Sequence, residues 1–247
     1  MYLGYKQTQM KSDIPTQSKN VFQKNKSVWS NIYERGTAGA YLHYPCEDLV
    51  VAVRRCVLPR LKNGKLLDIG FGSGNNLEFL AGLGFDCHGV EVSTAAIKIS
   101  EERLQGLKLT AKLYPLTEGH VYPFQDQTFD LVVAWHVLSH NDSEGLQRTI
   151  LEIRRVLKLG GILLATFPTL KDHRFVNSKR ITDNTYEFIQ DGSNQKGIII
   201  TMAEFEKDVR EIFSTFTNIQ VGYSEITIQG MTNSHWLVAA FPEGTMK

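Results

Sequence analysis

A glycine-rich turn at residues 66–74, Leu-Leu-Asp-Ile-Gly-Phe-Gly-Ser-Gly, contains the strongest chemical signal in this sequence. Three glycines at alternate positions, Gly70, Gly72 and Gly74, let a backbone turn tightly and approach a ligand closely, because no Cβ stands in the way. An apolar strand is predicted before the turn and a helix after it, and the first amides of that helix would face the same space. The turn is therefore a candidate nucleotide-binding loop at the carboxyl end of a strand.

Two carboxylates indicate what this turn binds. Asp68 stands just before the first glycine, where an anion would repel a pyrophosphate and attract a cationic ligand. Glu91 ends the next predicted strand about twenty residues later, where a carboxylate can accept both ribose hydroxyls or simply be solvated. A dinucleotide fingerprint also requires a small residue at the position of Asn75. The pattern favours a cationic ligand over a dinucleotide.

The segment Trp135-His-Val-Leu-Ser-His140 follows a predicted strand and would lie at the rim of the same crevice. His136 and His140 are four residues apart and could share a helical face, a spacing that metal sites also use. However, no glutamate follows His136 and no third ligand is evident, so we expect no metal. Upstream, Trp29, Tyr33, Tyr41 and Tyr44 could stack on a cation or pack a lid onto the domain.

Alternating strands and helices must position these residues. Strands are predicted over 65–69, 87–92, 112–114, 129–134 and 162–167, with helices over 76–82, 94–107 and 143–157. This alternation indicates an α/β fold with a doubly wound, mainly parallel sheet. A helix is predicted over 47–58 ahead of the sheet, and a helix over 202–213 with strands over 217–228 and 235–241 follows it.

Length, charge and cysteine content exclude several classes of protein. The 247 residues suit one α/β domain. A net charge of +1 argues against a nucleic-acid-binding surface. Three cysteines without a C-x-x-C pair predict neither a disulfide framework nor a zinc site. The first residues lack an apolar segment and no stretch is long enough to span a bilayer, so we expect a cytoplasmic protein.

Three stretches resemble class I S-adenosylmethionine-dependent methyltransferases of the small-molecule type. KLLDIGFGSGNNLEFLAGLGFDCHGVEVS is similar to their first two motifs, PFQDQTFDLVVAWHVLSH to the segment around their fourth strand, and EIRRVLKLGGILLATF to the helix and strand that follow. The resemblance covers residues 60–170 and implies a seven-stranded sheet of order 3-2-1-4-5-7-6 with the seventh strand antiparallel.

The composition along the chain and the resemblance together indicate a division of the chain. We expect a mobile arm over 1–26 and a single methyltransferase domain over 27–247. Within the domain, 27–60 would form an N-terminal helical lid and 61–167 the cofactor-binding core. A variable acceptor-side lid would cover 168–200, a polar stretch without strong periodicity. The final helix and antiparallel strands would occupy 201–247.

By this similarity the chain would bind S-adenosyl-L-methionine and methylate a small polar acceptor, as a monomer or homodimer without nucleic-acid or membrane partners. Glu118 takes the place of an Asp that often faces the adenine amino group, and His140 would make a structural hydrogen bond. The expected cofactor contacts are Asp68, Gly70, Gly72, Gly74, Asn75, Glu91, Val92, Glu118, Gly119, Trp135, His136 and Tyr33. The candidate catalytic groups are His136, as a general base or a cofactor-wall contact, and Tyr44.

Three other functions remain open from the sequence. An NAD(P)-binding oxidoreductase would use a similar glycine turn, although Asp68 and Asn75 argue against it. A catalytically inactive S-adenosylmethionine-binding protein would keep the same crevice. An RNA or protein methyltransferase would need a basic or elongated acceptor groove, which the sequence does not indicate.

Overall fold

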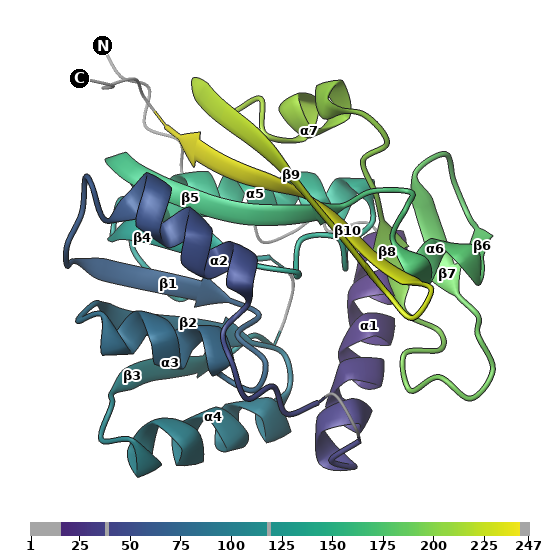
Figure 1. Cartoon of the computed structure of the whole chain (residues 1–247), viewed down its shortest axis with the longest axis horizontal. Coiled ribbons are helices and arrows are strands. Elements are labelled where there is room, and N and C mark those ends of the chain that lie inside the picture. The colour runs from purple at the N-terminus through teal and green to yellow at the C-terminus, as the bar shows by residue number, and fades with distance from the viewer. Residues whose placement is uncertain (1–15, 38–39, 118–119, 243–247) are drawn as a thin grey trace.

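A seven-stranded sheet forms the centre of the molecule (Figure 1), and its strands follow the order β3-β2-β1-β4-β5-β10-β9. The computed structural model describes residues 16–37, 40–117 and 120–242. The strands are β1 (Lys65–Ile69), β2 (Asp86–Glu91), β3 (Ala111–Pro115), β4 (Phe129–Ala134), β5 (Leu157–Pro168), β9 (Asn218–Ile228) and β10 (Met231–Phe241). β10 pairs antiparallel with both β5 and β9, whereas β1 to β5 pair in parallel. The predicted fold class and strand order are therefore confirmed.

Helices cover both faces of this sheet. The helices α2 (Glu47–Ala52), α3 (Asn75–Gly82) and α4 (Thr94–Gly106), with a π-helical turn over Val53–Val57, contribute to the apolar core on one face. On the other face α5 (Ser143–Val156) and α7 (Glu206–Ile212) pack against the sheet. Because both faces are covered, central strands such as β4 read as uninterrupted apolar runs.

The first helix, α1, corrects the expectation of a mobile arm over residues 1–26. It spans Thr16–Glu34, so residues 16–26 belong to a regular helix; residues 1–15 lie outside the described part of the chain. Its buried residues include Asn25 and Ile32. The helix lies beyond the carboxyl ends of the central strands (Figure 1). Packing against the rest of the fold, rather than its polar composition, thus places this segment.

The stretch over 168–200 also has more regular structure than its sequence indicated. It contains the short helix α6 (His173–Val176) and an antiparallel sheet of order β6-β7-β8, formed by Ser178–Arg180, Thr185–Phe188 and Ile199–Thr201. This small sheet has its own apolar cluster, to which Val28 and Trp29 of α1 contribute. Strands of three or four residues are too short to show a sequence period.

Most other predicted boundaries differ by one or two residues, which is within the usual uncertainty of helix and strand ends. Three differences are larger. β10 begins at Met231 instead of residue 235. β5 begins at Leu157, ahead of Gly160 and Gly161, and its register with β4 shifts at this point. α7 begins at Glu206 instead of residue 202. Within the described ranges, no helix has the length and apolar composition needed to cross a bilayer.

Candidate functional site

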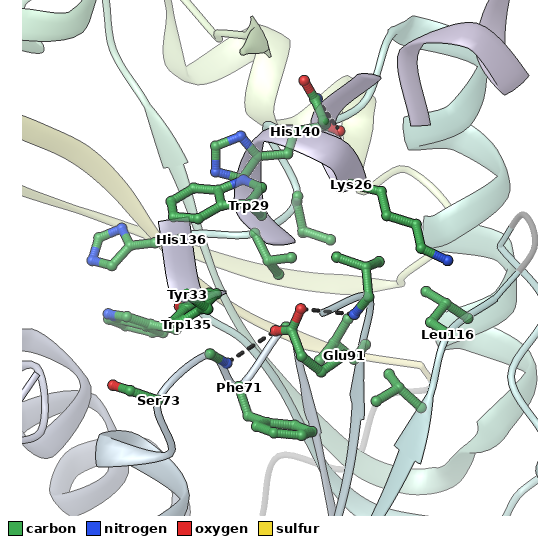
Figure 2. Close-up of a pocket in the computed structure, with 18 of the residues that line it drawn as sticks. Lys26, Trp29, Tyr33, Phe71, Ser73, Glu91, Leu116, Trp135, His136 and His140 are labelled. Carbon is green, nitrogen blue, oxygen red and sulfur yellow. Dashed lines mark hydrogen bonds between the residues drawn. The ribbon is translucent and has the colours of Figure 1, made fainter. Parts of the chain in front are cut away.

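A cavity of about 370 Å³ lies at the carboxyl ends of β1, β2 and β4, and α1 closes one side of it (Figure 2). Its walls come from the glycine turn after β1, the end of β2, the loop after β4 and one face of α1. This is the edge of a doubly wound sheet at which ligands bind, because the loops after parallel strands meet there.

The glycine turn has a backbone that only glycine adopts easily. Gly70, Gly72 and Gly74 all have positive φ, at +66°, +55° and +78°. A Cβ on Gly72 would overlap the hydroxyl oxygen of Tyr33, and one on Gly74 would come 2.7 Å from Ser100 Oγ. Both the backbone angle and the lack of space therefore require glycine at these positions.

Glu91 at the end of β2 links the glycine turn to the residues that follow β2. Its Oε2 accepts a hydrogen bond from Gly72 N at 3.0 Å, and its Oε1 accepts from Val92 N at 2.7 Å and Ser93 N at 3.0 Å. The side chain is buried. Burial raises the pKa of this carboxyl, and the three backbone hydrogen bonds oppose that rise. The carboxylate is thus held rigidly at the cavity wall, with lone pairs left for a ligand.

Asp68 is buried at the end of β1, and its Oδ2 has no hydrogen-bond partner among the described residues. Burial, reinforced by the charge of Glu91, raises the pKa of Asp68 well above its ordinary value. On the cavity wall, the indole Nε1 of Trp135 is likewise buried without a partner. Orphaned buried polar atoms are rare in folded proteins, and here they mark a place where a polar ligand would supply the missing contacts.

Aromatic rings line the side of the cavity formed by α1. The rings of Trp29 and Tyr33 lie 6.2 Å apart at 30°, and the Trp29 ring meets the His140 ring edge-on at 5.2 Å. Burial and the charge of Glu91 raise the pKa of Tyr33, so its hydroxyl stays protonated at neutral pH. Rings of this kind can surround a cation or an apolar group while excluding water.

His136 occupies an unusual conformation on the cavity wall. Its φ is +56°, its amide donates to Thr166 Oγ1 at 2.7 Å, and its ring packs edge-on against His235 at 4.4 Å. Burial, with His235 and Arg174 as further causes, lowers its pKa well below the ordinary histidine value. The imidazole is therefore neutral at physiological pH, and the same surroundings make it a weak base.

His140 lies on the same loop, in a turn instead of on the helical face considered from the sequence. Burial and the charge of Arg174 lower its pKa to about 3. Its Nδ1 is buried and has no hydrogen-bond partner among the described residues, while a backbone hydrogen bond with His136 opposes part of the fall in the pKa of the ring. No group of three or more His, Cys, Asp or Glu side chains comes together as a metal site in the described part of the chain.

The structure places the predicted site residues in three groups. Those lining the cavity are Tyr33, Gly70, Gly72, Asn75, Glu91, Val92, Trp135 and His136. Asp68 and Gly74 do not line the cavity themselves, but each is next in the chain to a residue that does, and Gly74 is the N-cap of α3. Tyr44 is 83% exposed and is not among the residues that line the cavity, so this geometry gives no support to its assignment as a catalytic group. Glu118 and Gly119 lie outside the described residues.

Several wall residues on α1 were not predicted: Phe22, Asn25 and Lys26, which join Trp29 on one face of the helix. Their spacing of three and four residues is that of a helical face. This signal was present in the sequence, but it crosses the boundary drawn at residue 26. His120 was also missed; its Nδ1 is 2.7 Å from Thr149 Oγ1, and burial lowers its pKa to about 4.

Comparison with known proteins agrees with this geometry. Residues 67–165 match the family model of a methyltransferase domain. Phosphoethanolamine N-methyltransferase 2 of Caenorhabditis elegans is 35% identical over 103 residues, which cover 41% of this chain and 23% of that protein. An uncharacterised protein of Methanocaldococcus jannaschii is 25% identical over 180 residues, covering 72% and 66% of the two chains. Each match therefore covers less than two thirds of the relative's own length.

A crystal structure of an S-adenosylmethionine-dependent methyltransferase from Methanosarcina mazei superposes with a TM-score of 0.63 at 20% identity, covering 79% of this chain and 97% of that one. The matched family region contains the glycine turn, Glu91 and the loop after β4. The orphaned Asp68 oxygen and the Glu91 carboxylate are suited to the cationic and ribose parts of S-adenosylmethionine. Residues 67–165 are therefore similar to a methyltransferase domain, and the fold of the chain is that of a solved S-adenosylmethionine-dependent methyltransferase.

Proposed function

We propose that this protein transfers the methyl group of S-adenosylmethionine to a small polar acceptor. The observation that carries the proposal is the cavity itself. Glu91 and Gly72, joined by a hydrogen bond, line one wall, and the aromatic face of α1 forms the opposite wall. A cavity closed on both sides favours a small acceptor over a polymer, because a polymer needs an open groove.

Each wall has its own task in this proposal. Glu91 would hold the ribose, the glycine turn would let the ligand approach the backbone, and Asp68 would face the cationic end. When bound, S-adenosylmethionine supplies a methyl group already activated by a sulfonium. The protein then contributes mainly alignment, which can lower a barrier by roughly 7–11 kcal/mol. Trp29, Tyr33 and Trp135 would keep water away from the reacting groups.

The titratable groups on the wall favour an acceptor that needs no strong base. His136 and His140 are neutral because burial lowers both pKa values, and Tyr33 keeps its proton because burial raises its pKa. In our proposal His136 is a wall contact, and the free Nδ1 of His140 is a polar contact for the acceptor. An acceptor with an available lone pair on nitrogen or sulfur suits this set of groups.

The charge of the wall bears on the acceptor as well. The Caenorhabditis elegans relative is by name a phosphoethanolamine N-methyltransferase. Among the described wall residues of this cavity, Lys26 is the sole lysine or arginine, whereas phosphate recognition usually uses several cationic or bidentate donors. We therefore propose an acceptor without a phosphate group.

Calorimetric titration with S-adenosylhomocysteine tests the cofactor assignment, with NAD⁺ as the negative control. We expect saturable one-to-one binding of the former and none of the latter. Screening of amines and thiols for methyl transfer, with phosphoethanolamine included, then tests the acceptor class. Cofactor binding with no turnover on any acceptor would favour an inactive S-adenosylmethionine-binding protein, and no cofactor binding by a folded sample would refute the proposal.

A further inference from the structure

Strand β8 has one edge without a neighbouring strand, because it is the outer strand of the sheet β6-β7-β8. The carbonyl of Ile198 faces β7, where it accepts a hydrogen bond from Phe188 N at 2.9 Å. Ile199 and Thr201 direct their backbone groups to the opposite, outer edge. Exposed strand edges are usually covered or blunted in native proteins, so the groups that meet this edge are of interest.

Asn25 of α1 covers the edge at Ile199. Its Oδ1 accepts from Ile199 N at 2.8 Å, while its Nδ2 donates to Ile199 O at 2.8 Å and to His140 O at 2.9 Å. The side chain is buried, with both amide donors and its oxygen in use. The reverse amide orientation would set its oxygen against two carbonyl oxygens, so the bonding pattern defines the orientation.

The loop after β4 is held by the same two elements. Ser139 O accepts from Thr201 N at 2.8 Å, and Asn141 O accepts from Thr201 Oγ1 at 2.6 Å. Together with the bond from Asn25 to His140 O, three successive carbonyls of this loop are bound by α1 and β8. The loop that faces the cavity thus depends on segments far from it in the sequence.

The ring of His140 is held from the same helix. Trp29 lies one helical turn after Asn25 and meets this ring edge-on at 5.2 Å, and Figure 2 shows the two rings side by side on the cavity wall. Residues four apart share a helical face. Helix α1 therefore contacts His140 at both its carbonyl and its imidazole.

We infer that Asn25 is a positioning residue of the cavity: by joining α1, β8 and residues 139–141, it sets the place and orientation of His140. Both amide donors and the oxygen of its side chain are already in use in these bonds. The inference rests on the proposed function only for what His140 does in the cavity, since the contacts themselves belong to the fold. A role limited to stability would leave His140 unchanged as long as the protein stays folded.

Asn25→Asp tests this inference, because aspartate keeps the oxygen that accepts from Ile199 N and loses both donors. Thr201→Val is a second variant that removes the hydroxyl bond to Asn141 O, together with the contact to Thr185 Oγ1 inside the small sheet. Lys24→Ala is the matched control: Lys24 is the neighbouring residue of α1 and pairs with Glu187 of β7 at 2.7 Å, so it also ties α1 to the small sheet. Unlike Asn25, it has no bond to the loop after β4 among those described.

Two measurements on the full chain saturated with S-adenosylhomocysteine decide the question. In hydrogen–deuterium exchange, we expect amides of 138–142 to exchange at least about tenfold faster in Asn25→Asp, with a smaller effect in Thr201→Val and little change in Lys24→Ala. In nitrogen NMR of the histidine rings, we expect His140 to remain unprotonated from pH 5 to 8 in the wild type and to begin titrating in Asn25→Asp. The groups that face this ring are Trp29, His136 and Arg174.

Equal exchange over 138–142 in Asn25→Asp and Lys24→Ala would overturn the inference, and so would faster exchange throughout β1 and β4, which would indicate a general loss of stability. An unchanged His140 titration in a folded Asn25→Asp protein would also overturn it. If the wild type failed to bind S-adenosylhomocysteine, the proposed function would fall, and the same comparison in the unliganded protein would still decide the role of Asn25.

Discussion

The two halves of the cavity are held together by different kinds of contact. In the cofactor half, which comprises the turn at 70–74 and the ends of β1 and β2, backbone amides and glycines meet one carboxylate, Glu91, that is 19 residues away from Gly72. The other half comprises α1, the small sheet and the loop at 136–141; we propose that the acceptor binds there and call it the acceptor half. Its Asn25 side chain bonds to residues 115 and 174 positions away. A short, continuous motif defines the first half, whereas scattered side chains define the second.

This difference has a consequence for how each half responds to substitution. Backbone geometry tolerates little change, since an added Cβ has no place to go at Gly72. Contacts between distant side chains can be exchanged for others that hold the same elements. We therefore expect the cofactor half to be sensitive at single positions, and the acceptor half to determine what the protein methylates.

Gly72→Ala should have the largest effect on the cofactor half. Alanine at φ +55° costs about 1–3 kcal/mol, and its Cβ would also overlap the Tyr33 hydroxyl. We expect S-adenosylhomocysteine affinity to fall by roughly a hundredfold or more in calorimetric titration. Gly82→Ala is the control, because a Cβ there has nothing within 4 Å. Wild-type affinity in Gly72→Ala would mean that the turn does not contact the ligand.

Glu91→Gln should weaken the same binding less, by roughly 10–100-fold, because hydrogen bonds to a charged group contribute about 1.5–3 kcal/mol. The amide nitrogen of glutamine would face an N–H donor on one side of the present carboxylate. The exposed Glu102→Gln on α4 is the matched control, with its side chain 66% exposed. Equal affinities of the two variants would remove Glu91 from the cofactor site.

Asp68→Asn should change how stability depends on pH. Burial raises the pKa of Asp68 in the folded state, so the folded protein binds this proton more tightly than the unfolded chain. Stability of the unliganded wild type should therefore fall as pH rises from the unfolded pKa toward the folded one. The variant lacks this loss, and we expect the difference in Tm, variant minus wild type, to grow by about 2–4 °C between pH 5 and 8. A difference that is constant or shrinks with pH would show that Asp68 is ionised without penalty.

Tyr44→Phe should have the smallest effect. The Tyr44 side chain is 83% exposed, and its described role is a backbone one, because its carbonyl accepts from Asn75 Nδ2 at 2.9 Å. We expect stability to stay within about 0.5 kcal/mol of the wild type and S-adenosylhomocysteine affinity to be unchanged. A clear loss of affinity would mean that the Tyr44 hydroxyl contacts the ligand, and that the cofactor half also depends on a side chain outside the glycine turn.

Sequence reasoning was most successful where structure is local. β1 and β4 were predicted with the bounds that they have, since short apolar runs between turn signals are typical of buried parallel strands. The glycine turn was recognised because its backbone angles are possible for few other residues. Expectations failed where tertiary packing overrides composition, as in residues 16–26 of α1 and in the short strands of 178–201.

The sequence by itself determined the alternation of strands and helices and most of the cofactor half, because those features depend on residue types that are close together along the chain. The strand order was an expectation drawn from the family resemblance, and the structure confirms it. Only the tertiary structure decided that Asn25 and Thr201 meet the loop after β4, that no described residue bonds to His140 Nδ1, and that the Tyr44 side chain is exposed. Contacts between residues 60 to 115 positions apart leave no local pattern in one sequence. They exist because folding covers the open edge of β8 and buries the face of α1 against it.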